Sequence, residues 1–134
     1  MNSVNSVMLL GHVTRDPRLK TLPSGKSVCE FGLALNRRWL DINGDAKQET
    51  TFVDVTAWNQ QAEVITQYCE KGRPLLVEGR LEQKRWETPT GEKRSRLKVV
   101  ARRVTFLPGH NGTAREAEAL PDWATEVLSD EPGH

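Results

Sequence analysis

The chain has 134 residues, of which 37% are hydrophobic and 28% are charged, and its formal net charge is +1. This length suits one domain with a buried core and is too short for two ordinary domains. No apolar run approaches the roughly 18 residues of a membrane span, and the start of the chain resembles neither a signal peptide nor a transit peptide. We therefore expect a soluble cytoplasmic protein.

The charge is divided unevenly along the chain. Residues 1–107 hold 18 Lys and Arg against 12 Asp and Glu, a balance of +6, whereas residues 108–134 hold one Arg and six acids, a balance of −5. A basic body favours a polyanionic partner, although ordinary surface charge can also produce such a balance. The difference between the two parts indicates a boundary near residue 107.

The two cysteines, Cys29 and Cys69, are too few for a disulfide framework and lack the spacing of metal ligands. We expect two reduced and mostly buried thiols. The sequence gives no reason to expect a bound metal or a cofactor.

Five segments have the composition and alternation of strands. In the second, Cys29, Phe31 and Leu33 alternate with polar or small residues. The run from Thr88 to Gly91 predicts a hairpin between the last two strands, and longer loops are expected at 15–26 and 40–48. The predicted strands are residues 6–14, 27–37, 51–58, 74–86 and 94–107.

One helix is predicted, from about Gln60 to Lys71. Asn59 can cap its first turn, Glu63 suits the positive end of the helix, and Lys71 followed by Gly72 marks its end. Its apolar stripe consists of Ala62, Val64, Ile65, Tyr68 and Cys69.

Three strands, a helix and two strands follow one another in the order of an OB-fold. We therefore predict an all-β, five-stranded OB-fold barrel with one helix between strands 3 and 4, in residues 1–107. Residues 108–134 are predicted to be a flexible acidic tail, with at most a short helical turn near 123–128.

Aromatic residues lie on the polar face of two predicted strands. Period two places Phe52 and Trp58 opposite the aliphatic face formed by Val53, Val55 and Ala57. In the fourth strand, Trp86 shares a face with Arg80 and Lys84, and the inward face consists of Leu75, Val77, Gly79 and Leu81. Phe31, Phe106 and Tyr68 are expected in the core.

Base stacking explains exposed aromatics among cations, because every base has a π-face and Lys or Arg can follow the phosphates. The alternative is that these aromatics are buried against a second subunit or a loop. Trp39 follows Arg37 and Arg38 at the mouth of the loop predicted at 40–48, where a flexible arm could close over a strand.

Nine motifs, in order and with matching spacing, are similar to those of a known family. They are VNSVMLLG at 4–11, Asp16-Pro17, PSG at 23–25, Trp39, ETTF at 49–52, WNQQAE at 58–63, Lys71-Gly72, VEGRL at 77–81 and KRW at 84–86. From Val4 to Leu107 the chain resembles the bacterial single-stranded DNA-binding proteins.

This resemblance implies an OB-fold that assembles as a homotetramer and wraps single-stranded DNA in replication, recombination and repair. It also implies that four aromatics stack on bases: Trp39, Phe52, Trp58 and Trp86. The cations expected to contact the DNA beside them are Arg37, Arg38, Lys71, Arg80, Lys84 and Arg85.

The chain departs from the family pattern in three places. Many members have Trp where this chain has Phe52 and Phe where it has Trp58, and well-studied members have a His at a subunit contact where it has Val53. The family usually ends in an acidic tip with a final Pro-Phe that recruits partner enzymes, and here the final aromatic is missing. Replication or repair enzymes could still dock on the tail residues Asp122, Trp123, Asp130, Glu131 and Pro132.

Other classes of function fit the sequence less well. His12, His110 and His134 are scattered, and no nucleophile–base spacing, P-loop, dinucleotide-binding motif or deaminase zinc motif is present, so we expect no enzyme. A different OB module, such as an RNA-binding or primosome accessory protein, could use the same stacking chemistry. A phage- or plasmid-borne version of the same protein would fit the altered tip.

Overall fold

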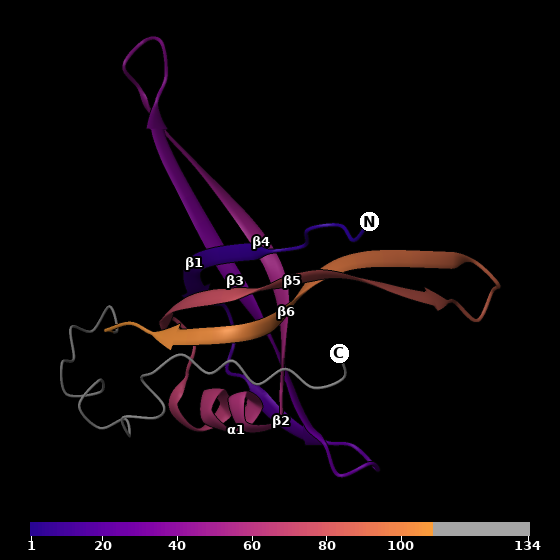
Figure 1. Cartoon of the computed structure of the whole chain (residues 1–134). Helices are drawn as coiled ribbons and strands as arrows, with labels where there is room; N and C mark the ends of the chain where they lie inside the picture. The colour runs from indigo at the N-terminus through magenta and orange to yellow at the C-terminus, as the bar shows by residue number, and fades with distance from the viewer. Residues whose placement is uncertain (109–134) are drawn as a thin grey trace.

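The computed structural model describes residues 1–108, which form six strands and one helix (Figure 1). The sheet has the strand order β1-β5-β6-β4-β3-β2, and a further pairing of β1 with β3 closes all strands except β2 into a barrel. The prediction of an all-β, five-stranded barrel with a helix between its third and fourth strands is confirmed. In chain order the elements are β1 (Val7–Val13), β2 (Arg18–Thr21), β3 (Ser27–Leu40), β4 (Ala46–Trp58), α1 (Asn59–Tyr68), β5 (Pro74–Glu87) and β6 (Lys93–Phe106).

The residues that alternate inward along the strands fill the barrel. Phe31 and Leu33 of β3 are fully buried, as is Val55, the partner of Phe31 on β4. Phe106 is buried and Tyr68 packs against the core, so the expectations for these aromatics are confirmed. The helix contributes Ala62, Val64 and Ile65 to the same core.

Both thiols lie in this core. Cys29 and Cys69 are unpaired and buried, which confirms the expectation of reduced, buried cysteines. Burial raises the pKa of Cys29 to about 11 and the pKa of Cys69 to about 12. Neither thiol therefore ionises appreciably near neutral pH, and neither is an activated nucleophile.

Three hairpin loops have the same backbone design. In each, the first residue donates its N–H to the carbonyl of the fifth, and the fourth residue, a glycine with positive φ, donates to the carbonyl of the first. This is a type I turn followed by a left-handed residue, a common way to join two strands with three loop residues. The loops are residues 22–26, 41–45 and 88–92, so the predicted hairpin at Thr88–Gly91 is confirmed.

Both regions predicted as long loops contain strand. The first, at 15–26, includes β2, whose four residues are all exposed and which pairs only with β3. The second, at 40–48, shrinks to five residues, because β3 continues to Leu40 and β4 begins at Ala46. Backbone pairing, rather than an inward apolar face, stabilises these segments, so periodicity does not reveal them.

The helix is shorter than predicted and is not capped as predicted. Trp58 occupies the N-cap position with an extended backbone and no side-chain hydrogen bond, while Asn59 itself has a φ of 52°. Asn tolerates this left-handed conformation better than most residues, so Asn59 provides the sharp turn from β4 into α1. Glu63 lies beyond the first turn, which has no acidic residue, and Gly72 turns the chain toward β5 after the helix has ended at Tyr68.

The predicted turn near 123–128 and almost all of the predicted tail lie outside the described residues. Over residues 1–108, no helix is both long and apolar enough to cross a membrane.

Gly79 of β5 packs closely against the backbone of β6. A Cβ on Gly79 would lie 3.0 Å from the carbonyl carbon of Val100 and 3.2 Å from the Cα of Ala101. The register shifts here, because Glu78 pairs with Arg103 and Gly79 with Ala101, which leaves a bulge in β6. The bare backbone therefore lets β5 pass close to β6 at this bulge, and farther along the two strands extend from the barrel as a hairpin (Figure 1).

Gly79→Ala is expected to lower the free energy of unfolding by about 1–3 kcal/mol, because the new methyl group would overlap the backbone of β6. Chemical unfolding followed by circular dichroism measures this change. Ser95→Ala, at an exposed position of β6, is the control and should alter stability by less than about 0.5 kcal/mol. A Gly79→Ala protein as stable as the wild type would contradict the prediction.

Candidate nucleic-acid interface

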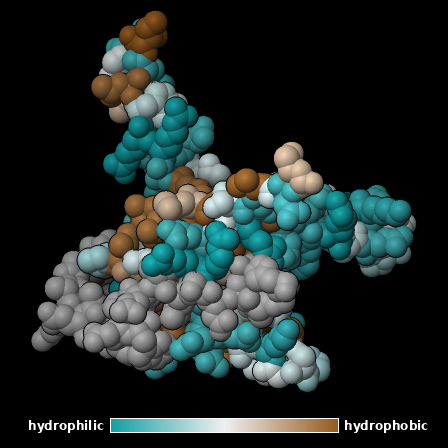
Figure 2. Space-filling view, in the orientation of Figure 1, coloured by the Kyte–Doolittle hydropathy of each residue, from teal (hydrophilic) through white to brown (hydrophobic). Residues whose placement is uncertain are grey.

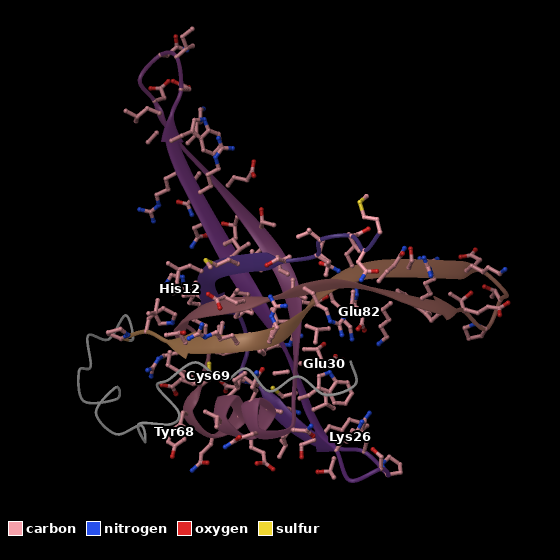
Figure 3. All side chains as sticks on the ribbon, in the orientation of Figure 1. His12, Lys26, Glu30, Tyr68, Cys69 and Glu82 are labelled. Atoms are coloured by element: carbon pink, nitrogen blue, oxygen red, sulfur yellow. The ribbon has the colours of Figure 1, made fainter. Side chains whose placement is uncertain are left out.

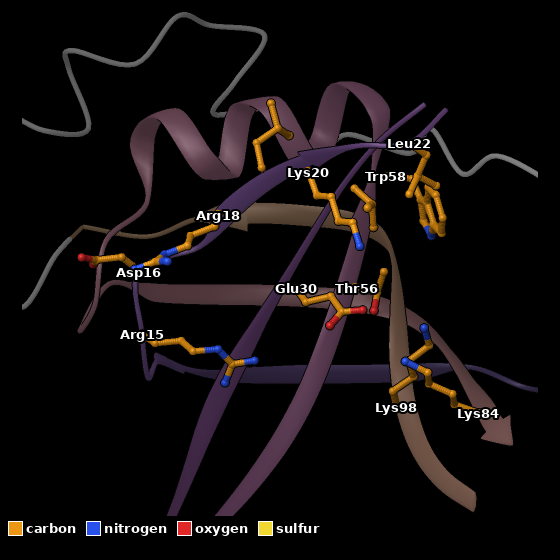
Figure 4. Close-up of a pocket in the computed structure, with 12 residues that line it drawn as sticks. Arg15, Asp16, Arg18, Lys20, Leu22, Glu30, Thr56, Trp58, Lys84 and Lys98 are labelled. Carbon is orange, nitrogen blue, oxygen red and sulfur yellow. The ribbon is translucent and has the colours of Figure 1, made fainter. Parts of the chain in front are cut away.

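A groove of about 840 Å³ crosses the outer face of the barrel, with walls from β2, β3, β4, β5 and β6 (Figure 4). Its charged lining is mainly basic, although it includes the carboxylates of Asp16 and Glu30. Such a surface favours a polyanion that can enter the groove. The cations in its lining are Arg15, Arg18, Lys20, Lys84 and Lys98.

The middle of the groove is polar and one end is aromatic. Glu30 and Thr56 are register partners on β3 and β4, and Lys20 points toward them from β2 (Figure 4). Trp58 stands beside Leu22 at the end of the groove and is half-buried. A flat ring is therefore held next to a row of cations, which is the combination expected for stacking on bases.

One carboxylate links two cations beside the groove. Asp54 lies on the polar face of β4, two residues from Thr56. Arg15 Nη2 lies 3.9 Å from Asp54 Oδ1, and Arg96 Nη1 lies 3.4 Å from Asp54 Oδ2. Each oxygen of this carboxylate thus faces one guanidinium, from opposite sides.

Glu82 repeats the arrangement on β5 (Figure 3). Arg80 Nη1 lies 3.1 Å from Glu82 Oε2, and Lys98 Nζ lies 3.6 Å from Glu82 Oε1. Arg80, expected to contact the DNA, is therefore engaged with a carboxylate.

Phe52 continues the polar face of β4 beyond the groove. Its side chain is 72% exposed, and its register partner is the small residue Ala34. The strand alternation that predicted an outward Phe52 and Trp58 is confirmed, since Val55 and Ala57 between them are buried. An exposed phenyl ring with no bulky neighbour across the strand offers its face to a ligand.

Trp39 lies inside β3 rather than at the mouth of a loop, which corrects the prediction. The β3–β4 register is unbroken, so Trp39 and Arg37 lie on the opposite face of the arm from Phe52, whereas Arg38 lies on the same face as Phe52. The Arg37 guanidinium covers the Trp39 ring, with 4.8 Å from Cζ to the ring centroid. The arm therefore presents one aromatic on each face.

The tip of this arm is unusually apolar (Figure 2). Leu40 is largely exposed and Ile42 fully so, while the visible side of the β5–β6 hairpin is mainly hydrophilic, although Leu97 on that hairpin is 61% exposed. The other two loops with this backbone design have Pro23 and Pro89 at the position of Ile42. Next to the tip lies a second, smaller hollow, lined by Arg38, Trp39, Leu40, Ala46, Lys47 and Gln48.

The β5–β6 hairpin carries Trp86 and Lys84 on one face. Trp86 is exposed and its register partner is Arg94, while Lys84 lines the groove. Arg85 lies on the opposite face, where its Nη2 donates to Gln83 Oε1 at 2.7 Å. Leu81, predicted to face the core, is 42% exposed instead, although its register partner Val99 is buried, because the pairing of β5 with β1 ends at Gly79 and leaves Leu81 at the rim of the barrel.

Lys71 does not line the groove. It lies in the turn after α1, where its backbone N–H donates to Asp16 Oδ1 at 2.8 Å. Among the ten residues predicted to contact DNA, Trp58 and Lys84 line the groove, and the other eight do not.

Several groove cations were missed by the sequence analysis. Arg15, Arg18 and Lys20 fall in the region predicted as a loop, where no periodicity marks a face. The outward orientation of Arg96 and Lys98 could have been predicted, because they alternate with Leu97 and Val99 along a predicted strand. Applying period two to β6 as well as to β4 and β5 would have placed them on the polar face.

Comparison with known proteins identifies relatives of the whole described region. The family model described as "Single-strand binding protein family" matches residues 4–107. The single-stranded DNA-binding protein of Treponema pallidum is 42% identical over 118 residues, covering 88% of this chain and 66% of the relative. The single-stranded DNA-binding protein of Aquifex aeolicus is 40% identical over 127 residues, covering 92% of this chain and 86% of the relative. The chain spans only 61–66% of the relatives from Treponema, Wolinella and Helicobacter hepaticus.

Comparison with solved structures also finds single-stranded DNA-binding proteins. A Plasmodium falciparum SSB in complex with ssDNA has a TM-score of 0.73 and 29% identity, covering 80% of this chain and 97% of the other. A deletion mutant of the Thermus aquaticus single-stranded DNA-binding protein has a TM-score of 0.70 and 30% identity, covering 81% of this chain and 53% of the other. With most of its length matched in sequence and in fold, this chain belongs to the single-strand binding protein family.

Proposed function

We propose that this protein binds single-stranded DNA largely without sequence preference and protects it during replication, recombination and repair. The observation that carries the proposal is the combination of exposed aromatics with a basic groove on the outside of the barrel. Aromatic rings stack on bases of any sequence, at about 1–3 kcal/mol per base, while Lys and Arg neutralise phosphates. The related Plasmodium structure, a complex with ssDNA, supports the same ligand.

The proposed path follows β4. Trp58 and Phe52 lie on the same face of the strand, roughly 20 Å apart at about 3.3 Å per residue. Bases stacked on these two rings would pass Asp54 and Thr56, with Lys98 and Arg15 within reach of the phosphates. Trp86 would extend the path onto the β5–β6 hairpin, whereas Trp39, on the opposite face of the β3–β4 arm from Phe52, would be reached by a strand that wraps around the arm.

The role we propose is binding without catalysis, in the cytoplasm and at the nucleoid, where single strands arise. Replication or repair enzymes would be recruited through the acidic segment that contains Asp122 and Trp123 or through the tip formed by Asp130, Glu131 and Pro132.

Homotetramer assembly is proposed through β1. In the described part of the chain, β1 pairs with β5 from Val7 to His12 but with β3 only at His12 and Val13. Its remaining edge is free of strand partners within residues 1–108, and on its outer face Met8 is 67% and Leu10 58% exposed. Proteins normally cover such an edge and such apolar side chains, which supports a subunit contact here.

Titration with a dT oligomer should quench tryptophan emission and show far higher affinity than titration with a blunt duplex of the same length, because stacking requires exposed bases. Phe52→Ala should weaken binding of the oligomer by about 1–3 kcal/mol. Val4→Ala removes exposed apolar surface outside the groove and should have no effect. Equal affinity for the duplex would refute single-strand binding.

Sedimentation of the wild type at micromolar concentration should give four times the chain mass. Leu10→Glu should give a smaller species, because it buries a charge at the proposed contact. Ile42→Glu, the same kind of change at the exposed arm tip, should leave the mass unchanged. A wild-type monomer would overturn the tetramer.

Deleting residues 108–134 should raise the affinity for single-stranded DNA, most strongly at low salt. The tail carries −5 and the body +6, so a tethered tail at roughly millimolar effective concentration competes with DNA for the groove. A full-length variant with the six tail acids changed to amides should reproduce the effect if charge is the cause. Unchanged affinity at both low and high salt would show that the tail does not compete.

A further inference from the structure

Two carboxylates stand among the cations of the proposed DNA-binding surface. Asp54 faces Arg15 and Arg96, and Glu82 faces Arg80 and Lys98. In both clusters each carboxylate oxygen meets a different cation. Four cations on this surface are thus engaged with acids in the free protein.

The stability of the fold does not explain the Asp54 cluster. Its side chain is 38% exposed, and the ion pairs of 3.4 and 3.9 Å are too long for strong hydrogen bonds. Exposed pairs of this kind contribute little to folding. Asp54 is nevertheless placed where it repels a phosphate that approaches the groove.

The backbone makes room for this cluster. The register partner of Asp54 on β3 is Gly32, and a Cβ there would lie 2.9 Å from Arg15 Nη1. Because Gly32 has no side chain, Arg15 can cross β3 from the β1–β2 connection and reach Asp54 on β4. Arg96 reaches the same carboxylate from β6.

We propose that Asp54 and Glu82 are specificity-determining residues that favour single-stranded over duplex DNA. In the free protein they engage cations that a phosphate would otherwise bind, and in a complex they repel phosphates. This inference rests on the proposed function and adds to it the means by which a basic groove rejects double strands.

The physical argument depends on what each form of DNA offers to a carboxylate. A duplex presents one phosphate about every 1.7 Å along its axis, and its non-specific binding to a basic surface depends almost entirely on phosphate contacts. A single strand also exposes the Watson–Crick edges of its bases. Each of these edges has an N–H group that can donate a hydrogen bond to a carboxylate. The carboxylates therefore oppose a duplex more than a single strand.

Asp54→Asn and Glu82→Gln test this inference, with Glu63→Gln as the matched control. Glu63 is exposed on α1, away from the two strands that carry Asp54 and Glu82, so its variant removes the same charge elsewhere. Affinities for a dT oligomer and for a blunt duplex of equal length are measured across a salt series. Thermal unfolding of each variant verifies the fold.

In the Asp54→Asn and Glu82→Gln proteins we expect duplex affinity to rise by about fivefold at low salt. Oligomer affinity should rise less, so that the preference for single strands falls. The salt dependence of duplex binding should also steepen, by up to about 0.9 in the log–log slope for each cation released. Glu63→Gln should keep the wild-type preference.

An unchanged preference in both the Asp54→Asn and the Glu82→Gln protein, or weaker binding of both DNA forms, would overturn the role of the carboxylates. A wild-type protein that does not prefer the oligomer would instead refute the proposed function itself. The two failures are therefore distinguished by the wild-type measurement.

Discussion

Strand alternation in a closed barrel assigns every side chain either to a small interior or to the outer surface. Phe31 and Phe106 occupy the interior together with the aliphatic residues, and the helix completes the same core. Phe52, on the opposite face of β4 from Val55, has no place inside. Stability therefore depends on one face of each strand, which leaves the other face free to carry rings and charges for binding.

The two long hairpins extend this division beyond the barrel. Once β3, β4, β5 and β6 leave the core, both of their faces are exposed, and cross-strand hydrogen bonds and the glycine loops hold them together (Figure 1). Trp39 and Trp86 can stand there without competing for space in the core. The cost is exposed aromatic surface, which is tolerable where a ligand covers it.

The sequence predicted the parts of the strands that have a buried face, and it did not predict the parts that are exposed on both faces. Elements with an inward apolar face, such as β3 near Phe31 and β5 near Val77, were found because burial imposes a period of two. The short strand β2 and the outer part of the arm have no inward face, so only three-dimensional pairing defines them. For this reason Arg18 and Lys20 were missed, and Trp39 was placed at a loop instead of on a strand.

The departures from the family pattern can now be interpreted physically. Trp58 is half-buried at the end of the groove beside Leu22, where a large indole fills the wall and still shows part of its face. Phe52 is far more exposed, so a smaller ring there leaves less apolar surface in water while it can still stack. Val53, where well-studied members have a His, packs against the barrel core. An aliphatic side chain at that position couples the strand to the core and removes a group that would titrate near neutral pH, so protonation at residue 53 cannot control the proposed assembly.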